Sequence, residues 1–313
     1  MTVMHANRRQ VLNSVLTTAV GAAVGTTALR LGLAPASAAT PIARTALPGG
    51  LTLIQGAGGN IISLGDAGST LLVDSGARGL DVRAVLGDVP LSAVDYLFNT
   101  HWHLDHTGGN EPLARAGATI IGHENTRLWM QQEIIVEWQD RTYPPRPKAA
   151  RPTRTFHYKP QTLTFGGQEI QYGYLEQAHT DGDIYVFFPE ANVLVAGDVV
   201  SHRYPVLDYS TGGWIGGMVN GLKTLIGIAD ADTVVVPGTG SVLTAEDMKA
   251  QLEMCEAVKE MIAETFRQAK DLEDLFATNP TREFDKRWGD PSQFLAQAHA
   301  GAWGHVRELG GIF

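Results

Sequence analysis

Short runs in which apolar and polar residues alternate fill the chain from residue 51 onward, and glycine-rich turns separate many of them. Alternation with a period of two is typical of strands that bury one face. The pattern predicts strands over residues 51–55, 60–64, 69–74, 94–100, 119–122, 161–165, 169–176, 183–188, 192–196 and 233–237.

Apolar residues at helical spacing occupy several of the intervals between these strands. They predict helices over residues 80–87, 110–116, 125–137 and 216–229, and over much of the chain after residue 245. Strands and helices follow one another in both halves of the chain, without a regular repeat. We therefore expect an α/β fold in which two sheets are flanked by helices.

Two segments carry neither pattern. Residues 40–47 form a linker rich in Pro and Ala, whereas residues 139–159 are rich in Pro and Arg. The second segment is longer than a simple connection requires, so we expect it to form a loop over a site.

Residues 1–38 are typical of an export signal that is cleaved. Arg8 and Arg9 precede a weakly apolar run over residues 11–33, and Ala-Ser-Ala at residues 36–38 is a cleavage pattern. Glycines and polar residues interrupt the run, which disfavours a retained membrane anchor. The paired arginines resemble twin-arginine signals. We expect a periplasmic or secreted protein with no membrane segment after cleavage.

Charge and cysteine content narrow the range of partners. The formal net charge is −9 and the signal contributes only positive charge, so the mature chain is more acidic still. An acidic body without a Lys/Arg-rich run excludes nucleic acid as an expected partner and leaves a small-molecule substrate. The single cysteine, Cys255, cannot form an intrachain disulfide, and its helical surroundings predict a buried thiol.

A cluster of metal-ligand residues follows directly on the apolar strand predicted at residues 94–100. In extended backbone, His101, His103 and Asp105 share one side, while His106 faces the other. A core would not bury three imidazoles and a carboxylate unpaired. The sequence therefore predicts a metal site at the mouth of this strand.

The cluster resembles the HxHxDH motif of the metallo-β-lactamase superfamily. Further motifs of that family match in the same order, in the segments 60–77 (ending in Asp74-Ser75-Gly76), 178–183 (AHTDGD), 195–198 (VAGD) and 233–240 (TVVVPGTG). The resemblance implies an αββα sandwich of two mixed sheets flanked by helices, formed by residues 45–245. Residues 246–313 are expected to form a helical extension packed on the same domain.

The resemblance also implies a ligand set. His101, His103 and His179 would bind a first zinc ion, Asp105 and His106 a second, and Asp198 would bridge both. Asp181 and Asp183 correspond to carboxylates near the third histidine. Either one of them orients a metal-bound imidazole, or they stabilise a turn.

The chain departs from the family pattern at Thr239, where the family has histidine in PGHG. A threonine hydroxyl is a poor zinc ligand. Three interpretations stay open: a weak or empty second site beside one tight zinc, replacement of the imidazole by His202 or His123, or loss of activity.

The implied chemistry is hydrolysis by a zinc-bound hydroxide, formed from a water whose pKa the metal lowers towards about 7. Asp105 would orient this nucleophile and accept its proton, and Tyr204 is a candidate proton donor to the leaving group. We expect a hydrolase of a small ester, lactone, lactam or thioester carbonyl. The alternatives are a mononuclear iron oxygenase of the persulfide dioxygenase type and a non-catalytic metal-binding accessory protein. The oligomeric state is not determined by the sequence.

Overall fold

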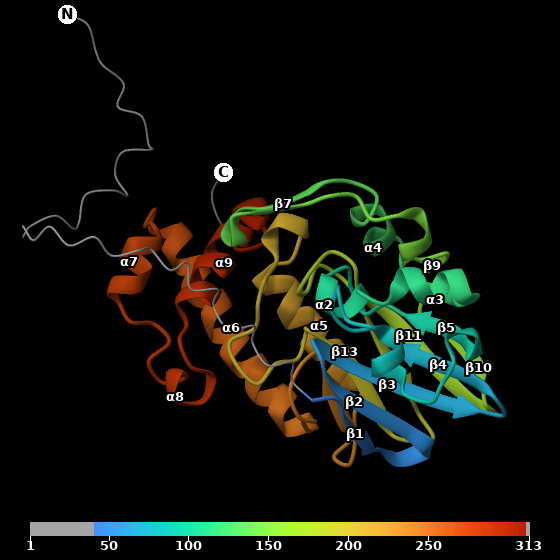
Figure 1. The fold of residues 1–313 in the computed structure, drawn as a ribbon. Helices are drawn as coiled ribbons and strands as arrows, with labels where there is room; N and C mark the ends of the chain where they lie inside the picture. Colours follow the sequence, from blue (N-terminus) through green and yellow to red (C-terminus); the bar gives the residue numbers. More distant parts are fainter. Residues whose placement is uncertain (1–40, 311–313) are drawn as a thin grey trace, which may run out of the picture. The chain divides into compact units, whose positions relative to one another are not determined.

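Two β-sheets lie face to face in the computed structural model, which describes residues 41–310 (Figure 1). The larger sheet has seven strands, in the spatial order β1 (Ala43–Ala46), β2 (Leu51–Ala57), β3 (Gly59–Asp66), β4 (Ser69–Val73), β5 (Val94–Phe98), β6 (Thr119–His123) and β9 (Arg154–Phe156). Strands β1 to β4 pair antiparallel, whereas β4, β5, β6 and β9 pair parallel.

The smaller sheet is mixed as well. Its five strands are, in order, β10 (Gln161–Phe165), β11 (Gln168–Leu175), β12 (Asp183–Phe188), β13 (Val193–Gly197) and β14 (Val234–Pro237). All neighbouring pairs are antiparallel except β13 and β14, which are parallel.

Side chains that alternate along each strand fill separate apolar layers. Ile62 and Leu71 belong to the cluster between the two sheets, whereas their neighbours Ile61 and Leu72 face the outer side of the larger sheet. The period of two in a strand produces this division. Helix α1 (Val82–Leu86) and residues of α3 (Asn110–Ala116) cover the outer layer.

Helices of the C-terminal part share one apolar cluster with residues on the outer face of the smaller sheet, and the first of these helices contacts the sheet. They are α5 (Ile215–Ile228), α6 (Ala245–Arg267), α7 (Leu272–Ala277), α8 (Asp285–Trp288) and α9 (Ser292–Ala302). Helix α6 begins with a capping box between Thr244 and Asp247. Its buried face includes Cys255, a fully buried thiol as predicted. Among the described residues, no helix is both long and apolar enough to cross a membrane.

The predicted αββα sandwich of two mixed sheets, with a helical C-terminal region, is confirmed, but some local predictions were wrong. The linker at residues 40–47 contains β1, whose four residues are all exposed and so lack alternation. The helix predicted over residues 125–137 ends early as α4 (Glu124–Trp129). The β-branched residues that follow form β7 (Ile134–Val136), which pairs with β8 (Arg141–Tyr143).

The segment at residues 139–159 is therefore less irregular than predicted, since it includes β8 and β9. The predicted export signal at residues 1–38 lies outside the described residues. Its cleavage, like the division of the remaining chain near residue 245, stays a prediction.

Candidate metal centre

The histidine cluster begins shortly beyond the end of β5. His101 and His103 lie on the same side of the chain, but the backbone then turns into the short helix α2 (Leu104–Thr107). The expectation of extended backbone as far as Asp105 was therefore wrong. The turn also brings His106 towards the other histidines, with its Nε2 atom 3.5 Å from Asp198 Oδ1, so His106 does not point away.

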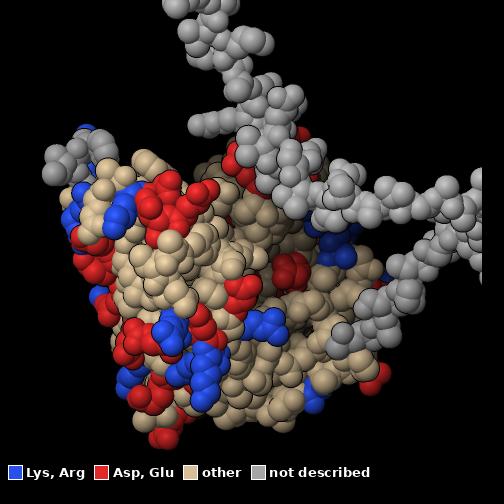
Figure 2. Space-filling model, turned by 90° about the vertical axis from the view of Figure 1, so that its left-hand side faces the viewer, with Lys and Arg blue, Asp and Glu red and all other residues tan. Residues whose placement is uncertain are grey.

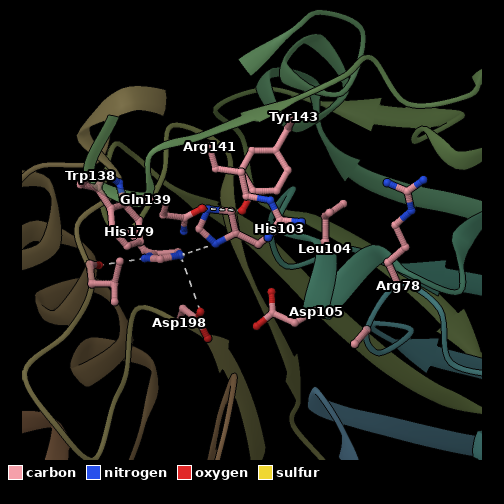
Figure 3. A pocket seen from close by; sticks show the side chains of 12 residues that line it. Arg78, His103, Leu104, Asp105, Trp138, Gln139, Arg141, Tyr143, His179 and Asp198 are labelled. Atoms are coloured by element: carbon pink, nitrogen blue, oxygen red, sulfur yellow. Dashed lines mark hydrogen bonds and ion pairs between the residues drawn. The ribbon is translucent and has the colours of Figure 1, made fainter. Parts of the chain in front are cut away.

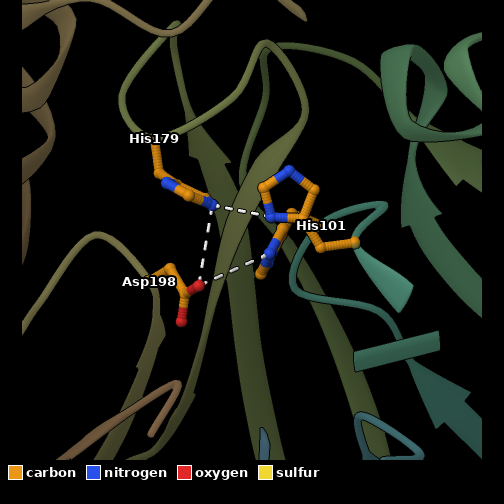
Figure 4. Close-up of side chains that lie close together, drawn as sticks. His101, His179 and Asp198 are labelled. Carbon is orange, nitrogen blue, oxygen red and sulfur yellow. Dashed lines mark hydrogen bonds and ion pairs between the residues drawn. The ribbon is translucent and has the colours of Figure 1, made fainter. Parts of the chain in front are cut away.

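Four side chains from the two sheets converge beside this turn (Figure 4). His101 and His103 follow β5 in the larger sheet, whereas His179 lies between β11 and β12 and Asp198 follows β13 in the smaller sheet. One ligand atom from each of these residues lies within 4.8 Å of the others. His103 Nδ1 is 3.1 Å from His179 Nε2, and Asp198 Oδ2 is 3.6 Å from the same nitrogen.

Asp198 faces two groups at once. Its Oδ2 atom lies 3.8 Å from His101 Nε2, on the side of the three histidines. Its Oδ1 atom faces His106, whose Nε2 also lies 3.7 Å from Asp105 Oδ2. Asp198 therefore lies between the group of three histidines and His106. The ligand roles of Asp105 and His106 remain predictions.

The buried nitrogens of this cluster fit a metal ion. His101 Nε2 and His106 Nε2 are buried and have no hydrogen-bond partner among the described residues. An unpaired polar atom in the protein interior is costly, and metal ligation would satisfy both nitrogens. Imidazole and carboxylate donors suit a divalent ion such as zinc.

The charges around the cluster act in opposite directions on its imidazoles. Although burial opposes it, Asp198 and Asp74 hold the pKa of His106 well above its usual value, and Asp198 and Asp183 raise that of His179. Burial lowers the pKa of His101 well below its usual value, and the nearby imidazoles of His106 and His103 lower it further. His101 is therefore neutral, the form that binds a metal. Burial alone would raise the pKa of Asp198, but the imidazole of His106 and its neighbours hold it well below the usual range.

Asp74 holds His106 in place. Its Oδ2 atom lies 2.7 Å from His106 Nδ1, and it also accepts a hydrogen bond from Thr100 Oγ1 at 2.7 Å. The Asp74 Oδ1 atom accepts from the backbone N–H of Thr100. The carboxylate thus occupies one ring nitrogen of His106 and leaves Nε2 for a ligand. The sequence marked Asp74 only as a member of the Asp-x-Gly turn.

Asp208 holds His103 as Asp74 holds His106, and it was not among the residues that the sequence predicted for the site. Its fully buried carboxylate places Oδ2 3.0 Å from His103 Nε2 and accepts a hydrogen bond from Thr211 Oγ1 at 2.7 Å. It also accepts from Trp138 Nε1 at 3.3 Å. No sequence motif marks Asp208. Only the fold brings the loop that carries it beside His103.

The turn that carries His179 is built by its neighbours. Asp183 accepts hydrogen bonds from the backbone N–H groups of His179 and Thr180, at 2.6 and 2.8 Å. Asp181 accepts from the hydroxyl of Tyr174. Of the two open interpretations, the structure matches stabilisation of the turn for Asp183, whereas the side-chain hydrogen bond of Asp181 joins it to Tyr174. The Nδ1 atom of His179 instead faces the Val206 carbonyl oxygen at 2.8 Å.

Of the two candidate replacements for the missing imidazole, His202 lies against the loop that carries Thr239, close to Gly240, whereas His123 lies at the start of α4. His123 is buried, accepts the backbone N–H of Asn125 at the start of α4 and stacks on Tyr174. His202 is exposed, and its Nε2 lies 2.7 Å from the Ser241 carbonyl oxygen. Neither belongs to the group of converging ligand atoms, and Thr239 itself is exposed.

Gly238, beside Thr239, lies directly against Asp198. A Cβ atom at this position would come within 1.8 Å of Asp198 Oδ1 and 3.0 Å of a ring carbon of His106. Glycine is therefore required there for the loop to approach the ligands. Tyr204, the candidate proton donor, does not line the cavity, because its buried hydroxyl donates to Asp285 Oδ1 at 2.9 Å.

A cavity of about 470 Å³ opens over the ligands (Figure 3). The loop after β4 contributes Arg78, and the β7–β8 hairpin contributes Trp138, Arg141 and Tyr143. No sequence motif includes any of these residues. The hairpin β7–β8 packs through its apolar residues on Trp102, the residue between the first two histidines. The prediction of a loop over the site thus identified the right region but not its structure.

Charged side chains on the face shown in Figure 2 are mixed in sign. Asp and Glu lie among Lys and Arg there, and no continuous basic patch covers the described part of this face.

Comparison with known proteins agrees with this geometry. A family model described as "Metallo-beta-lactamase superfamily" matches residues 55–253. Hydroxyacylglutathione hydrolases of Brucella ovis and Brucella abortus are each 30% identical over 114 residues. The match spans only about a third of this chain and of those relatives, 34% of each.

Solved structures share the fold at low sequence identity. The DIM-1 metallo-beta-lactamase matches with a TM-score of 0.55 and 17% identity, over 69% of this chain and 97% of that one. A metallo-beta-lactamase family protein from Thermus thermophilus matches with a TM-score of 0.58 and 18% identity, over 86% and 94%. The family match covers more than half of the chain, and the chain belongs to the metallo-beta-lactamase superfamily.

Proposed function

We propose that this protein is a metal-dependent hydrolase that acts on a small ester, lactone, lactam or thioester carbonyl. One observation carries the proposal. The nitrogens of His101, His103 and His179 and a carboxylate oxygen of Asp198 converge within 4.8 Å at a cavity of about 470 Å³. A cavity of this size suits a small molecule.

The metal and the side chains have separate tasks in this proposal. A bound divalent ion would supply a Lewis acid and activate water. His101, His103 and His179 would hold that ion as neutral ligands, and Asp198 would balance its charge. Asp208 holds His103, and the Val206 carbonyl and the Asp183 turn hold His179, so these two ligands need little reorganisation on binding.

Asp105 is the candidate catalytic residue. Its carboxylate lines the cavity, and its side chain is 47% exposed, so a water molecule or substrate can reach it. A carboxylate at this position can orient the attacking water and accept its proton. If a second metal binds beside His106, Asp105 becomes one of its ligands instead, because the Asp105 Oδ2 atom lies 3.7 Å from His106 Nε2.

The similarity to relatives named hydroxyacylglutathione hydrolase supports hydrolysis as the reaction. Because the similarity covers about a third of each chain, the substrate of those relatives is not transferred. We infer zinc as the metal from the nitrogen and oxygen ligands. A first site would bind it tightly, and a second site would be weaker because Thr239 replaces the family's histidine.

Metal analysis of protein purified without added metal tests the proposal together with a panel of para-nitrophenyl esters, lactones, lactams and thioesters. We expect zinc and hydrolysis in the wild type, and loss of both in His103→Ala. His157→Ala, which removes an exposed histidine, is the matched control and should keep both. Iron with oxygen consumption would favour the oxygenase instead. Tight metal binding without turnover of any substrate would favour an accessory protein.

A further inference from the structure

Three arginines lie around the cavity of a chain whose formal net charge is −9. Arg78 follows the Asp74-Ser75-Gly76 turn, Arg141 belongs to β8, and Arg146 follows the hairpin. Arg78 and Arg141 line the metal cavity itself. In Figure 3, Arg141 lies beside Tyr143 above the ligands, and Arg78 lies on the other side of Leu104.

None of the three has a carboxylate partner among residues 41–310. The arginines that form ion pairs there are Arg115, Arg127, Arg267 and Arg287. Glu111 is near enough to influence Arg146, but it pairs with Arg115 at 2.8 Å. What distinguishes these three from other arginines without an ion pair is their place, since two of them line the metal cavity and the third adjoins it.

Arg146 gives the strongest indication. Its Nε and Nη1 atoms are buried and have no hydrogen-bond partner in the described part of the chain. Burial and the nearby charge of Arg78 lower the pKa of Arg146. A half-buried cation beside another cation lowers stability unless an anion compensates it. Arg146 adjoins the cavity, because Arg78, Leu104 and Tyr143 line both the metal cavity and the small hollow that holds Arg146.

Both arginines of the cavity wall are exposed, and their backbones belong to ordered parts of the fold. The backbone N–H of Arg78 donates to the Leu104 carbonyl oxygen at 2.9 Å, which ties it to the turn that carries Asp105. The guanidinium carbon of Arg141 lies 4.6 Å from the ring centre of Tyr143. Stacking on an aromatic ring orients a guanidinium without consuming its N–H donors.

We propose that the substrate of this site carries a carboxylate in addition to the carbonyl group that is hydrolysed, and that Arg78 and Arg141 bind this carboxylate. The proposal rests on the proposed function. The carbonyl would face the ligand cluster, and the carboxylate would face the opposite wall of the cavity. A guanidinium presents parallel N–H donors that match the two oxygens of a carboxylate. Arg146, in the hollow beside the cavity, adds positive potential.

A matched pair of substrates tests the proposal on the metal-loaded, full mature protein. Para-nitrophenyl pentanoate is neutral, and mono-para-nitrophenyl glutarate has the same acyl length with a terminal carboxylate. We expect the wild type to prefer the glutarate ester in kcat/KM. Arg78→Gln and Arg141→Gln should each lower kcat/KM for that ester roughly 10- to 100-fold, the range of a charge-assisted hydrogen bond, and lower kcat/KM for the neutral ester much less.

Arg83→Gln is the control for loss of charge, because Arg83 is an exposed arginine on α1 and does not line the cavity. It should leave the preference intact. Arg146→Met should weaken the preference and leave the melting temperature equal or higher, since it removes an uncompensated buried cation. A lower melting temperature would show that Arg146 serves the fold and would remove it from the proposal.

The remaining outcomes separate this inference from the proposed function. Hydrolysis of both esters without an arginine-dependent preference would overturn the carboxylate site alone. If neither ester is hydrolysed, the proposed function fails for such esters. Binding of a carboxylate can then be measured by tryptophan fluorescence, because Trp138 lines the cavity. Acetate should then bind the wild type more tightly than Arg141→Gln at equal metal content. Equal binding, or an arginine-dependent preference for methyl phosphate over acetate, would overturn the carboxylate assignment.

Discussion

Asp208 Oδ2 lies 3.0 Å from His103 Nε2, although 105 positions separate the two residues in the sequence. The contact leaves His103 Nδ1 directed at His179 Nε2 and the metal position. The same carboxylate accepts a hydrogen bond from Trp138 in the hairpin over the cavity. One buried side chain thus joins a metal ligand to the wall of the substrate cavity.

Asp208→Asn should weaken binding of the first metal about 10- to 100-fold, because the amide keeps the shape of the side chain but loses its charge. Competition with a chelating dye measures this affinity directly. Trp138→Phe removes the N–H that reaches Asp208, together with part of the ring, and should change metal affinity much less. An Asp208→Asn protein that binds metal as tightly as the wild type would exclude the positioning role.

Thr239→His should create a second tight metal site. In the wild type, the second position has only Asp105, His106 and Asp198, so we expect one tight equivalent and a second that binds roughly 10- to 100-fold more weakly or worse. A calorimetric titration with zinc counts the equivalents of metal that bind. Val242→His adds an imidazole to an exposed position of the same loop and serves as the control. Two equally tight equivalents in the wild type would contradict a weak second site.

Stability should fall in acid because of His123. Burial, and the nearby His157, lower the pKa of His123 to about 4 in the folded protein, compared with about 6.5 when unfolded. The contribution of neutral His123 to the free energy of unfolding is complete above pH 6.5. It is lost as the pH falls through about 4, because the unfolded chain takes up the proton first.

Urea unfolding at pH 7 and pH 5 measures this dependence. Between these values the wild type should lose about 2 kcal/mol more than His123→Asn, which keeps a side-chain oxygen to accept the N–H at the start of α4. The difference between the two proteins removes the pH dependence that they share, including that of metal binding. An identical pH dependence would show that His123 is not the group responsible.

The export prediction is tested on native protein, because residues 1–38 lie outside the described residues. N-terminal sequencing should find a mature chain that begins near Ala39 and is located outside the cytoplasm. Replacing Arg8 and Arg9 by lysine should leave the precursor in the cytoplasm, as expected for a twin-arginine signal. A native N-terminus before Ala36 would contradict the prediction.

Local pattern alone was sufficient for much of the fold. Strands such as β10 and β12 and the helix α3 begin and end at the predicted residues, because period-two alternation and helical spacing reflect which side of each element is buried. The pattern failed where that signal is absent, as in the fully exposed strand β1. It also failed after α4, where neighbouring apolar residues fit helix and hairpin alike.

The sequence by itself determined the family and the residues that converge on the metal position, because HxHxDH, the histidine of AHTDGD and the aspartate of VAGD are short contiguous motifs. Only the tertiary structure decided how those residues are held and what surrounds them. His106 faces Asp198 because α2 turns the chain. Asp208 reaches the site from a loop with no motif of its own, and Arg78 lies just beyond the Asp74-Ser75-Gly76 turn without belonging to the motif. Such contacts join the ends of strands in different sheets, so they depend on how the sheets pack and leave no periodic signal along the chain.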